Sequence, residues 1–213
     1  MIRVTRLPAP QTLKKKAKKW IAQLISARTN SQRERVLRRY RNAEVRQTLV
    51  AMFHGKCAYC ESRITHVDYG HIEHYRPKAG PSGRPDLAFE WSNLLLACGI
   101  CNGASYKSDR FPEAADGGPI INPCEDDPAC HFEFHYDPIA KLASVYGVTS
   151  RGEVTERLLG MNRWELRQQR SNLIRKLVVI AQFAASDSEA AEILRSAQQS
   201  EAEYAAFARS LFG

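Results

Sequence analysis

Two cysteine pairs, Cys57-Ala-Tyr-Cys60 and Cys98-Gly-Ile-Cys101, bracket the stretch of sequence that decides the fold. A Cys-x-x-Cys turn brings two thiolates together on one tight loop, and two such turns supply the four sulfur ligands of a tetrahedral zinc ion. One pair alone would be a weak signal, but two pairs of equal spacing are a strong one. The sequence therefore predicts a structural zinc site made of these four cysteines.

The 37 residues between Cys60 and Cys98 exceed the spacing of a simple zinc ribbon, so a further element is inserted between the two turns. Glycines and prolines from residue 80 to 85 indicate a loop in this insert. We expect a short strand from His71 to Tyr75 before that loop and a partner strand from Trp91 to Ala97 after it. A helix is expected to begin in the segment from Asn102 to Lys107.

A Cys-x-x-Cys turn, an acid-His pair with Pro three residues on, Asn, and Cys-x-x-Cys-Asn follow one another here, and this order resembles the zinc-containing HNH endonucleases. More narrowly, residues 56–61, 72–78 and 111–112 resemble the HNH subunit of Septu-type and retron-associated anti-phage systems. Residues 121–128 and 159–170 are also similar to that family, so the resemblance covers most of the chain.

The resemblance implies an α+β fold, in which an HNH ββα-metal core with a structural zinc ion is embedded in mainly helical N- and C-terminal segments. We expect a basic helical segment over residues 1–54, the nuclease core over residues 55–112, and a loop, hairpin and helical segment over residues 113–213. The three segments are expected to pack as one compact unit.

The resemblance also assigns roles to individual residues. His74 is the expected general base, since imidazole has the side-chain pKa nearest to physiological pH. Glu73 and Asn102 are the expected ligands of a catalytic Mg²⁺ or Mn²⁺, because hard cations prefer oxygen donors. Asn93 is expected to orient the loop around His74 without reacting, and Lys107 to bind phosphate.

Two departures from the family pattern concern these residues. Glu73 stands where most HNH enzymes have Asp, and Lys107 follows the final Asn by five residues instead of three. Strand alternation would point Glu73 and His74 to opposite sides, so a strand end or a bulge is required there. His71 is either a second metal ligand or an ordinary surface histidine.

Positive charge is concentrated at the N-terminal end of the chain. The net charge is +8, but residues 1–50 hold 14 Lys and Arg against two acids. Clustered positive charge attracts nucleic acid through counterion release, although a charge run is often only a solvated helix face. The predicted nucleic-acid contacts are Lys14, Lys15, Lys18, Lys19, Arg76 and Lys78.

No apolar run reaches the ~18 residues that a membrane span needs, and the N-terminus lacks the pattern of a secretory signal. A cytoplasmic protein with reduced thiols is expected. A second zinc site from Cys124, Cys130, His131 and His135 is not expected, because their spacing is not typical of a zinc finger.

The resulting hypothesis is a metal-dependent HNH endonuclease that cuts DNA and leaves 5′ phosphate and 3′ hydroxyl ends. The resemblance implies anti-phage defence with a separate ATPase subunit, and the sequence has no Walker-type phosphate loop of its own. A homo-oligomer is also compatible with the apolar C-terminal helices. The alternatives are an RNA nuclease, including one that cuts tRNA, and a zinc-dependent binding module without catalysis.

Overall fold

The computed structural model describes residues 1–66 and 68–213, which fall into two compact units. The first, here called the N-terminal unit, contains Val4–Cys57 and Ile64–Phe111. The second, the C-terminal unit, contains Met1–Arg3, Ala58–Arg63 and Pro112–Gly213. The division of the sequence into three segments stays a prediction.

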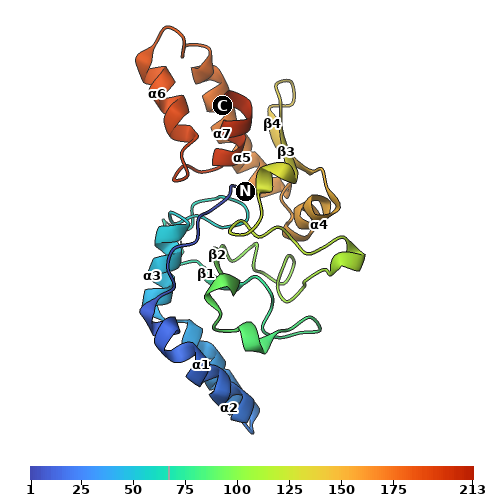
Figure 1. Cartoon of the computed structure of the whole chain (residues 1–213). Helices are drawn as coiled ribbons and strands as arrows, with labels where there is room; N and C mark the ends of the chain where they lie inside the picture. The colour runs from blue at the N-terminus through green and yellow to red at the C-terminus, as the bar shows by residue number, and fades with distance from the viewer. Residues whose placement is uncertain (67) are drawn as a thin grey trace. The chain divides into compact units, whose positions relative to one another are not determined.

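Three helices open the N-terminal unit: α1 (Gln11–Ser26), α2 (Asn30–Leu37) and α3 (Ala43–Met52). The first two pack against each other as a helical pair (Figure 1). α1 buries Leu13, Trp20 and Leu24 and exposes its lysines, as its amphipathic pattern predicts. α2 is preceded by Thr29, whose side chain caps the helix in a reciprocal capping box with Gln32.

A two-stranded antiparallel sheet follows, made of β1 (His71–His74) and β2 (Leu94–Ala97). In its register Glu73 is opposite Leu95. All four residues of β2 are buried, and α3 packs on that strand. The expected strand pair is therefore confirmed, although Trp91–Asn93 forms a short 3-10 helix ahead of the second strand.

The helix expected from Asn102 to Lys107 is absent, and this part of the prediction is wrong. The segment forms consecutive turns, in which the amide of Lys107 donates to the carbonyl of Cys101. Gly103 lies so close to Gly99 that a Cβ at residue 103 would come within 2.8 Å of the Gly99 oxygen. The tight turns bring the Lys107 side chain into the interior, where it is fully buried.

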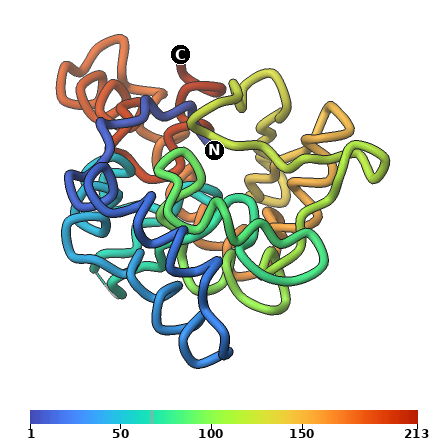
Figure 2. Tube along the Cα trace, turned by 60° about the horizontal axis from the view of Figure 1, so that its bottom comes forward, coloured from blue at the N-terminus to red at the C-terminus, as the bar shows by residue number. Residues whose placement is uncertain are grey.

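The C-terminal unit combines a hairpin with four helices. The hairpin pairs β3 (Phe132–Asp137) with β4 (Leu142–Gly147), as the alternating aromatic residues predict. The helices are α4 (Ser150–Leu159), α5 (Trp164–Ala181), α6 (Ser188–Ala197) and α7 (Ala205–Phe212). α5, α6 and α7 pack against one another, and Figure 2 shows the last two lying close to the end of the chain.

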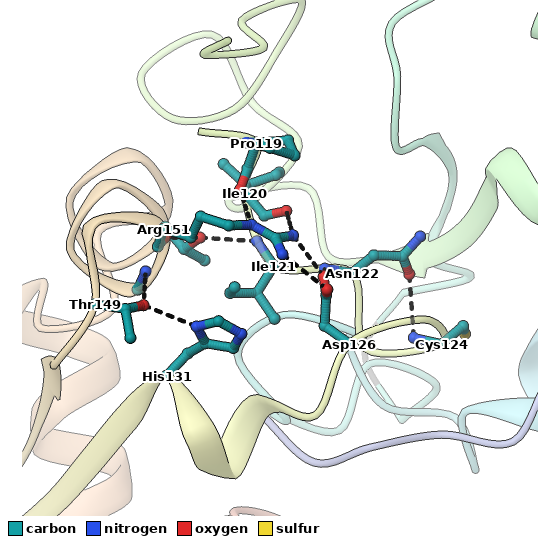
Figure 3. A network of polar contacts seen from close by, with 11 residues as sticks. Pro119, Ile120, Ile121, Asn122, Cys124, Asp126, His131, Thr149 and Arg151 are labelled. Carbon is teal, nitrogen blue, oxygen red and sulfur yellow. Dashed lines mark hydrogen bonds and ion pairs between the residues drawn. The ribbon is translucent and has the colours of Figure 1, made fainter. Parts of the chain in front are cut away.

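Arg151 on α4 fixes the loop that leads into the hairpin (Figure 3). Its guanidinium donates to the carbonyl oxygens of Pro119 and Ile120 at 2.8 and 3.2 Å, and it forms a bidentate pair with Asp126 at 2.9 and 2.6 Å. A planar guanidinium suits this arrangement because its donors form a rigid fork.

Among the described helices, none is long and apolar enough to cross a membrane.

Arg170 on α5 has a similar role in the core of the C-terminal unit. Arg170 is 2% exposed, and its guanidinium donates to the carbonyl oxygens of Ala143 and Met161 and to the Asn162 side chain at 2.7–3.0 Å. One side chain therefore joins β4 to the turn between α4 and α5.

Replacing this side chain should destabilise the protein. Arg170→Met leaves buried carbonyl oxygens without donors, so we expect the free energy of unfolding to fall by about 2–4 kcal/mol in chemical denaturation. Arg175→Met, at an exposed position of the same helix, should change it by less than about 0.5 kcal/mol. Equal effects of the two variants would contradict this account of the core.

Candidate active site

The four predicted zinc ligands come together. The sulfur atoms of Cys57, Cys60, Cys98 and Cys101 all lie within 4.8 Å of one another. The amide of Cys101 donates to the sulfur of Cys98 at 3.4 Å, as expected of a knuckle that holds a thiolate. Four sulfurs at this spacing suit a tetrahedral thiolate site, so the donor set fits the metal that the sequence implied.

A second cysteine-histidine metal site is not formed in the part of the chain that the structure describes. The imidazole Nδ1 of His131 pairs with the Thr149 hydroxyl at 2.7 Å, and the amide of Cys124 donates to the side chain of Asn122 at 3.1 Å (Figure 3). These contacts belong to the packing of the loop before the hairpin.

A cavity of about 570 Å³ in the N-terminal unit collects most of the predicted catalytic residues. His71, Glu73, His74, Lys78 and Asn102 all line it. Strand alternation does not separate Glu73 from His74, because β1 ends at His74. The strand end that the sequence required is therefore present.

His74 is held in one orientation at the wall of this cavity. Its Nε2 lies 3.0 Å from the carbonyl oxygen of Ala88. Because a carbonyl oxygen only accepts, Nε2 carries the hydrogen and Nδ1 keeps its lone pair. Burial, together with the nearby Lys78 ammonium, lowers the pKa of His74 to about 3. The imidazole is consequently neutral at physiological pH, which is the form that can accept a proton.

Glu73 is ion-paired with Lys107 inside the protein. The Lys107 ammonium lies 2.5 Å from Oε1 of Glu73 and donates to the backbone oxygen of His74 at 2.9 Å. Burial raises the pKa of the Glu73 carboxyl, and Lys107 opposes that shift. Lys107 is not among the residues that line the cavity, and its predicted phosphate contact stays a prediction.

Asn93 ties together the two ends of the loop around His74. Its Oδ1 accepts from the amide of Arg76 at 2.7 Å, and its Nδ2 donates to the carbonyl oxygens of Arg76 and Leu87 at 3.0 and 3.3 Å. Asn93 does not line the cavity. This geometry is compatible with an orienting role, which stays a prediction.

Asn102 contacts His71 at the wall of the cavity. Its Nδ2 lies 3.2 Å from Nδ1 of His71, which leaves the amide oxygen of Asn102 available to another ligand. The carboxyl of Glu73 lines the same cavity. The oxygen donors expected to hold a hard cation therefore share one space.

Of the predicted nucleic-acid contacts, Lys78 alone is among the residues that line the cavity. Lys78 lines the cavity, whereas the predicted lysines of α1 are exposed and do not. The Arg76 guanidinium lies 4.4 Å from the centre of the Phe111 ring and also stands outside the cavity lining.

Sequence reasoning missed Tyr40 and Arg41, which follow α2 and line the cavity. The helical spacing of Tyr40 predicts a core residue, and the side chain is indeed buried. The sequence alone carries no signal that it lies next to His74.

Comparisons with known proteins match the segment that contains His74, Glu73 and Asn102. The family model for HNH endonuclease matches residues 57–108. The Septu protein PtuB from Bacillus mycoides (strain KBAB4) is 32% identical over 161 residues, covering 65% of this chain and 53% of that protein. The Septu protein PtuA from the same strain is 33% identical over 145 residues, which cover 57% of this chain and 19% of that protein.

The Retron Vc95 putative HNH endonuclease from Vibrio cholerae serotype O1 biovar El Tor is 29% identical over 129 residues, covering 58% of this chain and 60% of that protein. The chain thus spans only about half the length of the PtuB that it matches, at 53%. No solved structure matches the chain significantly. The expected family is confirmed: residues 57–108 form a domain of the HNH endonuclease family, and the chain is related to PtuB and to the retron nuclease.

Proposed function

We propose that this protein is a metal-dependent endonuclease that hydrolyses phosphodiester bonds of DNA. The observation that carries the proposal is the single cavity lined by His74, Glu73 and Asn102. A base, a carboxylate and an amide oxygen facing one space are the groups that metal-assisted hydrolysis of a phosphodiester requires.

His74 is the proposed general base. Its Nε2–H is held by the Ala88 carbonyl, so Nδ1 is the nitrogen that takes a proton from the attacking water. Among the described residues, no hydrogen bond competes for Nδ1. The edge of the Tyr40 ring packs on the imidazole at a centroid distance of 4.5 Å and fixes its plane.

Glu73 and Asn102 are the proposed ligands of a catalytic Mg²⁺ or Mn²⁺. Such an ion, when bound, supplies positive charge to the scissile phosphate and to the departing oxygen. Lys107 pairs with Oε1 of Glu73 and so fixes the orientation of the buried Glu73 carboxyl group. Mg²⁺ typically keeps several waters and takes only one or two protein carboxylates, so a small protein ligand set is sufficient.

The proposed setting is anti-phage defence in the cytoplasm, together with a separate ATPase subunit. The supporting observation is that the relatives carry the names Septu and retron.

The first test is cleavage by the His74→Ala variant. The purified protein should cut labelled duplex DNA only when Mg²⁺ or Mn²⁺ is added, and His74→Ala should reduce the rate by about 100-fold or more at unchanged zinc content. His135→Ala, at an exposed position of the C-terminal unit, is the control and should cut normally. Labelled RNA is tested in parallel, and cleavage of RNA alone would refute the assignment of DNA as substrate. Cleavage by His74→Ala at the rate of the unaltered protein would refute the role of His74 as general base.

The second test concerns the proposed zinc ion. Elemental analysis should find one zinc per chain, and Cys98→Ser should lose both the zinc and the cooperative thermal transition, since binding of a structural metal is coupled to folding. Cys130→Ser is the matched control, because that exposed cysteine lies outside the cluster. Retention of zinc by Cys98→Ser would contradict the assignment.

The third test separates the two partners of the buried ion pair. Lys107→Met leaves the Glu73 carboxyl uncompensated and should lower the free energy of unfolding by about 3–5 kcal/mol. Adding Glu73→Gln to that variant should restore part of the loss, because the buried charge is removed. Calorimetry should find weak Mn²⁺ binding in both variants. A single variant as stable as the double variant would contradict the pairing.

A further inference from the structure

The cavity has a wall that comes from outside the HNH endonuclease domain. Tyr40 and Arg41 line it, and they lie ahead of residues 57–108. Both belong to the N-terminal unit, at the 3-10 turn Arg38–Tyr40 that ends α2. The N-terminal segment therefore contributes side chains to the space that contains His74.

Tyr40 organises this wall. The side chain is only 5% exposed, and its ring meets the His74 imidazole nearly perpendicularly, at 85°. A buried ring in this edge-to-face contact has little rotational freedom, and such pairs contribute beyond simple area burial. Tyr40 thus joins the turn after α2 to the end of β1.

Two cations approach the same ring. The Lys78 ammonium lies 5.2 Å from the centre of the Tyr40 ring, and the Arg41 guanidinium carbon lies 5.8 Å from it. Nε of Arg41 also donates to the Tyr40 hydroxyl at 3.3 Å. Both distances lie within the range of cation–π attraction, so the ring holds two positive groups at the wall of one cavity.

These two cations lack carboxylate partners. Within residues 1–66 and 68–213, neither Arg41 nor Lys78 forms an ion pair. Arg46 lines the same cavity but is engaged differently, because it donates to the carbonyl oxygens of Tyr69 and Gly70 at 2.6 Å each. Arg46 is therefore a structural residue, whereas Arg41 and Lys78 have charge available for a ligand.

The position of this charge indicates the ligand. Two like charges held together repel each other, and a bound anion removes that repulsion. The Tyr40 ring that both cations approach lies 4.5 Å from the His74 ring, so the cations are near the imidazole. An anion bound by them would lie in the cavity that His74 also lines.

We propose that Arg41 and Lys78 form a phosphate-binding subsite, in which they hold a backbone phosphate of the substrate strand beside His74. Tyr40 is the positioning residue of this subsite, because it orders both cations and the imidazole. The inference rests on the proposed nuclease function, and it makes the N-terminal segment part of the active site.

The test is steady-state cleavage of labelled duplex DNA, and of labelled RNA, by Arg41→Gln/Lys78→Gln. The double variant should raise KM at least tenfold while kcat changes less than about threefold. The slope of log KM against log salt should fall by about one, because the subsite neutralises one phosphate and each lost phosphate contact removes about one unit. Arg175→Gln/Lys176→Gln removes the same charge from exposed positions of α5 and is the control. A double variant indistinguishable from this control would overturn the subsite.

Variants of Tyr40 test the positioning role. Tyr40→Leu should lower kcat about tenfold or more, and Tyr40→Phe should recover most of that loss because it keeps the ring. If both variants matched the wild-type kcat, Tyr40 would be a packing residue only. Circular dichroism and zinc content confirm that each variant is folded.

The failure of the subsite and the failure of the nuclease proposal are distinguishable. If the wild-type protein cuts neither nucleic acid, the nuclease proposal falls. In that case, fluorescence anisotropy with uncut duplex DNA still tests the subsite, because Arg41→Gln/Lys78→Gln should bind at least tenfold more weakly than the control. If the wild-type protein cuts DNA and this variant cuts like its control, only the subsite falls.

Discussion

The convergence of four cysteine sulfurs within 4.8 Å is the constraint on which the rest of the site depends. Cys57 and Cys60 precede β1, whereas Cys98 and Cys101 follow β2, so the sulfur cluster closes the segment that contains both strands. A sheet of two short strands is only marginally stable in water, because two strands bury too little apolar surface. A metal bound by the four sulfurs would supply the missing stability.

Within this frame, buried polar contacts set the chemistry of the cavity wall. Lys107 reaches the end of β1 from the turns that replace the expected helix, and there it pairs with Glu73 and the His74 carbonyl. The Ala88 carbonyl selects the tautomer of His74 from the other side. Leaving any polar group of this buried network without a hydrogen-bond partner would cost free energy. The network therefore favours a single arrangement of the side chains at the cavity wall.

Much of this could be predicted from the sequence. Repeated Cys-x-x-Cys spacing is a local signal, and it predicted the sulfur cluster correctly. The two short strands were predictable from the glycines and prolines between them, and the hairpin from the alternation of aromatic and polar residues. The turns after Cys101 were not, because the close approach of Gly103 to Gly99 is a detail of local backbone geometry that residue patterns do not signal.

Contacts between distant residues were also beyond the sequence. The position of Lys107 between Glu73 and His74 depends on how the turns direct its side chain, and the family resemblance indicated no such ion pair. Tyr40 likewise shows helical periodicity, which explains its burial and carries no information about its neighbour His74. Sequence patterns indicate which groups are available, whereas packing decides which of them meet.

The central claim is that one cavity presents both the imidazole and a site for a hard cation. The most direct measurement is anomalous diffraction from crystals soaked in Mn²⁺, collected at the manganese edge. The account predicts a manganese peak between the Glu73 carboxyl and the Asn102 amide oxygen, next to His74 and separate from the cysteine cluster. Saturating Mn²⁺ without a peak in that cavity, or with manganese bound only elsewhere, would contradict it.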